Sequence, residues 1–63
     1  MFPTESRIAL AEQAAETLPG STLRVEDVAP AYVPEGYVSI PDTDQRIKKL
    51  HNGSSVVLTM LPF

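Results

Sequence analysis

The stretch Asp42–Leu61, DTDQRIKKLHNGSSVVLTML, decides the fold, because its two halves favour different secondary structures. Asp42, with Gln45 three residues later, is a variant of the capping box that begins many helices. We therefore predict a short helix over residues 43–51. Asn52-Gly53 is typical of a helix end, since glycine accepts the left-handed backbone conformation found there.

The second half of this stretch is the longest apolar segment of the chain. Ser55–Leu61 presents apolar side chains on both faces, interrupted only by Thr59, so we expect it to form the most buried strand. Tyr37–Ile40 can form a second strand, which the neighbouring prolines favour at a sheet edge. If these two strands share one sheet, the helix between them makes the pair parallel and the crossover right-handed.

The N-terminal part of the chain predicts a helix followed by a strand. Residues 5–17 place their apolar side chains on one arc of a helix, and Leu18-Pro19-Gly20 ends it. Thr22–Val28 alternates between apolar and polar residues as a half-buried strand does, with an end or a bulge at Asp27. The predicted order is α-β-β-α-β, a small α+β domain over residues 1–63 with a three-stranded sheet and two helices.

Length and composition exclude several classes of protein. The chain has 63 residues, a net charge of −3 and no cysteine, which allows one domain and excludes disulfide-stapled and zinc-ribbon modules. No apolar run is long enough to span a bilayer. The first twenty residues carry three glutamates and no basic start, which disfavours a signal peptide, and we expect a cytoplasmic protein.

Charge is distributed unevenly along the chain. All eight acidic residues lie within residues 1–44, whereas residues 45–63 carry three cations and no acid. This acidity argues against wrapping nucleic acid, because affinity for nucleic acid comes largely from neutralising phosphates.

Catalytic machinery is not evident in the sequence. His51 is the only histidine, with Ser54 and Ser55 close by, but no third group is placed to orient its imidazole. A solvated histidine near the negative end of the second helix explains it better. Glycine-rich phosphate loops are absent, so we expect a non-enzymatic protein without a cofactor.

Two pairs of carboxylates have ordinary explanations. Glu12 and Glu16 lie one turn apart on the polar face of the first helix, and a solvated face does not give the desolvation that a general acid needs. Asp42 and Asp44 resemble the opening of a calcium loop, but the ligands and the glycine that should follow are missing. We therefore expect no metal site.

Two segments are candidate binding surfaces. The first combines tyrosines with a proline-containing turn of type I over Val33–Gly36, a composition typical of recognition loops. The second is the basic cluster of the predicted second helix, which includes His51 and could meet an acidic partner or a phosphate backbone. The alternative for the first segment is a connection whose tyrosines cover the core. The alternative for the second is a solvated helix face. The candidate partner-binding residues are Tyr32, Pro34, Glu35 and Tyr37 in the first segment and Arg46, Lys48 and Lys49 in the second.

The function expected from these features is that of a protein-binding module, a small inhibitor or adaptor that occupies another protein's surface. Its size class includes the small host-takeover proteins of phages. Because so short a chain buries a small core, we also expect a homodimer or a hetero-complex, with apolar surface from the first helix or the last strand at the contact. The alternative function is that of a small homo-oligomeric DNA-binding regulator that uses the basic second helix.

Overall fold

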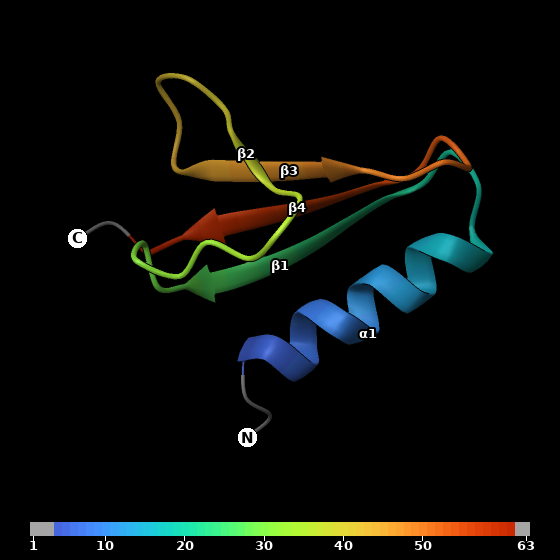
Figure 1. Ribbon diagram of the computed structural model, residues 1–63, viewed down its shortest axis with the longest axis horizontal. Helices are drawn as coiled ribbons and strands as arrows, with labels where there is room; N and C mark the ends of the chain where they lie inside the picture. The colour runs from blue at the N-terminus through green and yellow to red at the C-terminus, as the bar shows by residue number, and fades with distance from the viewer. Residues whose placement is uncertain (1–3, 62–63) are drawn as a thin grey trace.

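A mixed four-stranded sheet with one helix makes up residues 4–61, the part of the chain that the computed structural model describes (Figure 1). The strand order is β1-β4-β3-β2, with β1 parallel to β4 and the other neighbouring pairs antiparallel. The α+β class is confirmed, whereas the predicted two helices and three strands are wrong in number. The elements are α1 (Thr4–Thr17), β1 (Thr22–Val28), β2 (Val38–Ser39), β3 (Gln45–Lys49) and β4 (Ser55–Met60).

The helix predicted over residues 43–51 is a strand and a turn. β3 pairs with β4 along its whole length, and Ile47 lies opposite Val57. Asp42 does not cap a helix, because it has a φ of 62° in the loop between β2 and β3. The capping signal is local and weak, and pairing with the apolar strand β4 outweighs it.

Asn52 and Gly53 turn a β-hairpin instead of ending a helix. The Leu50 amide donates to the Ser54 carbonyl at 2.9 Å, and the Gly53 amide donates to the Leu50 carbonyl at 3.1 Å. Gly53 has a φ of 84°, the left-handed conformation that closes a three-residue hairpin loop. Asn-Gly between two strand-like segments is a hairpin signal, so the sequence did contain evidence for this turn.

The predicted parallel pair also has the wrong partner. Strand β4 is parallel to β1, with Thr22 opposite Ser55, while β2 pairs only with β3. The edge position of β2, the bounds of β1 and the bulge near Asp27 are confirmed. Asp27 has a φ of 57°, and the register of β1 on β4 shifts between Val25 and Val28.

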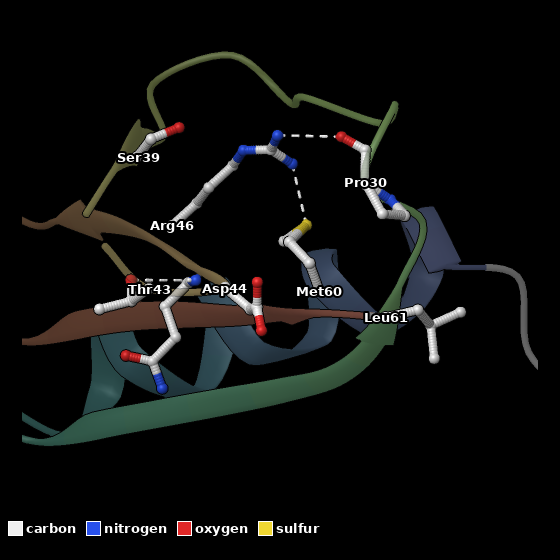
Figure 2. Close-up of a pocket in the computed structure, with 8 residues that line it drawn as sticks. Pro30, Ser39, Thr43, Asp44, Arg46, Met60 and Leu61 are labelled. Atoms are coloured by element: carbon white, nitrogen blue, oxygen red, sulfur yellow. Dashed lines mark hydrogen bonds between the residues drawn. The ribbon is translucent and has the colours of Figure 1, made fainter. Parts of the chain in front are cut away.

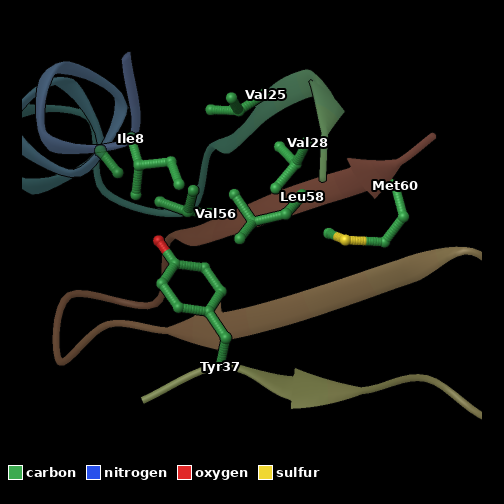
Figure 3. Packing of buried hydrophobic residues seen from close by; sticks show 8 residues of the cluster. Ile8, Val25, Val28, Tyr37, Val56, Leu58 and Met60 are labelled. Atoms are coloured by element: carbon green, nitrogen blue, oxygen red, sulfur yellow. The ribbon is translucent and has the colours of Figure 1, made fainter. Parts of the chain in front are cut away.

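The core lies on one face of the sheet. Figure 3 shows Val56, Leu58 and Met60 projecting from β4 into this core, with Ile8 arriving from α1. The central position of β4 explains why it is the most buried strand, as the sequence predicts. Among residues 4–61, the buried cluster consists of Ile8, Ala15, Val25, Val28, Tyr37, Val56, Leu58 and Met60.

Two different segments cover this face. Helix α1 packs against β1 and β4, and the irregular segment 29–37 supplies Tyr32 and Tyr37 to the same core. The opposite face carries Val38, Ile47 and Val57 in one row across three strands. Within residues 4–61 no helix lies over that row.

One asparagine side chain joins the hairpin turn to the end of α1. The Asn52 amide nitrogen donates to the carbonyls of Ala15 at 2.9 Å and Glu16 at 3.1 Å. Its oxygen accepts from the backbone amide of Ser54 at 3.1 Å and from the Ser54 hydroxyl at 2.6 Å. This satisfies two of the carbonyls that a helix leaves free at its C-terminus, and it satisfies the buried Ser54 hydroxyl as well.

Candidate protein-binding groove

An open groove of about 530 Å³ lies at the seam between α1 and the irregular segment. Both segments cover the same face of the sheet, and the groove lies along the line where they adjoin. Glu5, Ile8, Ala9 and Glu12 line it from α1, Tyr32, Pro34, Glu35 and Gly36 from the loop, and Lys48 from β3.

Helix geometry aligns the α1 side of the groove. Glu5, Ile8 and Glu12 are three and four residues apart, so they follow one another along one face of the helix. Ile8 is only 4% exposed and belongs to the core as well. The wall of the groove therefore combines an apolar centre with a carboxylate on either side.

A tight turn shapes the loop side of the groove. The Tyr37 amide donates to the Pro34 carbonyl at 3.4 Å, and Gly36 between them has a φ of 89°. The predicted type I turn over Val33–Gly36 is therefore displaced by one residue, and the positive φ is that of a type II turn. A Cβ atom at Gly36 would lie 3.3 Å from the Lys48 Cε, so the backbone of the turn rests on the lysine stem.

A polar cluster joins the two sides at the floor of the groove. The Tyr37 hydroxyl donates to Glu12 Oε2 at 2.7 Å, and Lys48 Nζ lies 3.5 Å from the same oxygen. The Lys48 ammonium also lies 5.9 Å from the centre of the Tyr37 ring. Burial, and then the hydrogen bond to Glu12, raises the pKa of the Tyr37 hydroxyl above its ordinary value, so it remains a donor.

The sequence places Glu12 on a solvated helix face, whereas the structure shows it partly buried. Its side chain is 29% exposed and accepts the Tyr37 hydrogen bond across 25 residues of sequence. Two residues so far apart in the sequence form no local pattern that would predict their contact. The helical periodicity alone therefore placed Glu12 on the polar face.

Arg46 holds the irregular segment on the sheet from behind the groove. Its guanidinium donates to the carbonyls of Pro30 at 2.9 Å and Tyr32 at 3.1 Å, and lies 2.9 Å from the Met60 sulfur. Figure 2 shows this side chain reaching across a cavity of about 260 Å³ that opens beside β3. Because these contacts occupy much of the guanidinium, Arg46 fixes the shape of the loop and is less available to a ligand.

The structure places the seven predicted binding residues in different positions. Four of them, Tyr32, Pro34, Glu35 and Lys48, line the groove, and Tyr37 lies behind its floor. Arg46 is a structural support. Lys49 follows Lys48 on β3 and therefore projects from the opposite face of the sheet.

The side chains that the sequence suggests as catalytic candidates lie in a turn or in internal hydrogen bonds. His51 is exposed in the hairpin turn, and Ser54 is 1% exposed and bound to Asn52. Within residues 4–61 no group of three histidine, cysteine or acidic side chains is arranged to hold a metal ion. In the same part of the chain, α1 is too short and too polar to cross a membrane.

Comparison with known proteins gives no relative. No protein-family model, no curated protein and no solved structure matches the chain.

Proposed function

We propose that this protein is a non-enzymatic protein-binding module, an inhibitor or adaptor that receives part of a partner protein in the groove between α1 and the 29–37 segment. One observation carries the proposal: the two segments suggested separately by the sequence contribute to one groove, Tyr32, Pro34 and Glu35 from the first and Lys48 from the second. A half-buried tyrosine beside a proline offers contact area with little loss of side-chain freedom on binding.

The groove is favoured over the sheet edges as the contact surface. Free edge strands pair readily with other chains, and proteins commonly obstruct them. Here the Arg7 guanidinium donates to the Glu26 carbonyl on β1 at 2.8 Å, and the bulge near Asp27 interrupts the same strand. At the other edge, β2 has only two residues.

Self-association remains a prediction, but the surface expected at the contact between two copies differs from the one that the sequence suggested. Strand β4 is central, and Val56, Leu58 and Met60 are already buried beneath α1 and the loop. A homodimer would therefore use the groove, the exposed side of α1 near Leu10, which is 55% exposed, or the uncovered face of the sheet near Val38, which is 67% exposed.

The alternative of a DNA-binding regulator depended on a basic second helix, and residues 45–49 form strand β3 instead. The basic residues lie on a strand, where Lys48 and Lys49 point to opposite faces and Arg46 is bound to carbonyl groups. No observation favours this second function.

Photocrosslinking tests the proposal. A benzophenone amino acid placed at Val33, which is 58% exposed beside the groove, should crosslink a partner in extract from the cells that express the protein. The same probe at Leu18, which is 51% exposed beyond the C-terminal end of α1 and does not line the groove, is the matched control. Tyr32→Ala should weaken the Val33 crosslink about 30-fold, as expected for an aromatic anchor worth about 2 kcal/mol.

Folding must be measured in parallel, because Tyr32 also packs against the core. Glu35→Lys is the second variant, since Glu35 is exposed at the tip of the turn and its replacement should leave the melting temperature unchanged. If neither variant changes the crosslinks at Val33 while both remain folded, the groove is not the contact surface.

A further inference from the structure

We infer that the groove binds a short extended segment of a partner protein that carries lysine or arginine; this inference rests on the proposed function. The groove is lined by three glutamates and a single lysine. Within residues 4–61, Lys48 and Glu12 form the only ion pair. Glu5 and Glu35, one on each side of the groove, have no cationic partner among those residues.

The length of the α1 wall of the groove sets the length of the segment. Glu5 and Glu12 are seven residues apart on α1, which places them about 10 Å apart along the helix axis. An extended chain advances about 3.3 Å per residue, so about three residues span this distance. The groove volume of about 530 Å³ lies within the range of sites that enclose ligands.

The lining suits the two parts of a basic side chain. Half-buried Tyr32 and Pro34 offer apolar surface to the aliphatic stem, and Glu5 and Glu35 receive the charged end. Lys48 shows this arrangement within the chain itself, because its ammonium lies between Glu12 Oε2 and the ring of Tyr37. An acidic segment would meet unneutralised carboxylates on both sides and be repelled.

Selection from a displayed library of random decapeptides tests this inference. The purified protein should enrich sequences rich in lysine or arginine, and binding of the best synthetic peptide should weaken as salt rises. Glu35→Lys should raise its dissociation constant at least tenfold. Glu16→Lys is the matched control, because it makes the same charge change at an exposed α1 residue that does not line the groove, and it should change binding less than twofold.

The outcomes separate this inference from the proposed function. Enriched peptides without excess basic residues that still depend on Tyr32 would overturn the charge preference and leave the binding module intact. A failure to enrich any peptide whose binding depends on Tyr32 or Glu35 would overturn both. A concentration-dependent dimer that Glu35→Lys dissociates, and that excludes the peptides, would identify a second copy of the chain as the occupant and overturn the inference.

Discussion

Helix α1 and the 29–37 segment cover the same face of the sheet by different physical means. The helix is attached by apolar side chains, with Ile8 4% exposed and Ala15 fully buried. The irregular segment also buries Tyr37, but it depends on a guanidinium that reaches up from β3 to two of its carbonyl groups. A helix satisfies its own backbone, whereas an irregular segment needs side chains to do so.

This difference has a functional consequence. Apolar packing along the length of α1 holds the helix, and the hydrogen bonds of Arg7 and Asn52 add to it. The loop buries Tyr37, but the rest of its tyrosine and proline surface depends on the polar contacts of Arg46. Substitutions in the loop should therefore change recognition at a smaller cost in stability than substitutions beneath the helix. The following variants test this contrast, beginning with the largest expected effect.

Ile8→Ala should break the attachment of the helix. It removes a buried aliphatic side chain at the junction of α1 with the sheet, and we expect a loss of about 3 kcal/mol in the free energy of unfolding. Leu10→Ala on the same helix is the control; Leu10 is 55% exposed, so the change should be within about 0.5 kcal/mol. Urea denaturation followed by circular dichroism measures both, and equal losses would contradict the packing assigned to α1.

Arg46→Met should release the loop while the helix stays in place. The carbonyls of Pro30 and Tyr32 lose their donor, and we expect a loss of about 2 kcal/mol. Hydrogen exchange should accelerate at the amides of Tyr32 and Tyr37, whereas α1 and β4 keep most of their protection. Lys49→Met on the opposite face of β3 should leave the exchange pattern unchanged. Uniform acceleration across the chain would show that the loop and the helix do not differ in attachment.

Tyr37→Phe should have the smallest effect at neutral pH, about 1 kcal/mol, because half-buried Glu12 can recover part of the lost hydrogen bond from water. The pH dependence is more informative. The pKa of the Tyr37 hydroxyl is raised on folding, so its contribution is complete below the unfolded value of about 10 and is lost as the pH rises towards the folded value.

Urea titrations between neutral pH and about pH 11 should therefore show wild-type stability falling more steeply than that of Tyr37→Phe above about pH 10. The two proteins differ only by the Tyr37 hydroxyl, so the comparison isolates the proton of that group. Parallel curves would show that Tyr37 does not hold its proton more tightly in the folded state.

Local sequence patterns predicted the elements whose signals are periodic. The arc of apolar residues located α1, the alternation of Thr22–Val28 located β1, and the run after Ser54 identified the most buried strand. The failure at Gln45–Lys49 has a physical cause. A single isoleucine between basic residues has almost no periodicity. Its conformation is decided by pairing with β4, which lies further along the chain and places Val57 opposite Ile47.

The candidate site was predictable only on its loop side. Tyrosine, proline and glycine within six residues indicate a recognition loop by composition, and Tyr32, Pro34 and Glu35 do line the groove. The α1 side was missed because Glu12 becomes part of a site only through Tyr37, which approaches it when the chain folds. The predicted basic cluster was divided by the pleat of β3, which separates neighbouring residues onto opposite faces.

The parallel pairing of β1 with β4 also sets the order of folding events. Strands β2, β3 and β4 are joined by short hairpin loops that close quickly, whereas residue 22 must find residue 55 across about half of the chain. We therefore expect the three-stranded meander to form first and the α1-β1 unit to dock on it in the slow step. The groove is shaped by segments from both units, so the last folding step is also the one that creates the surface offered to a partner.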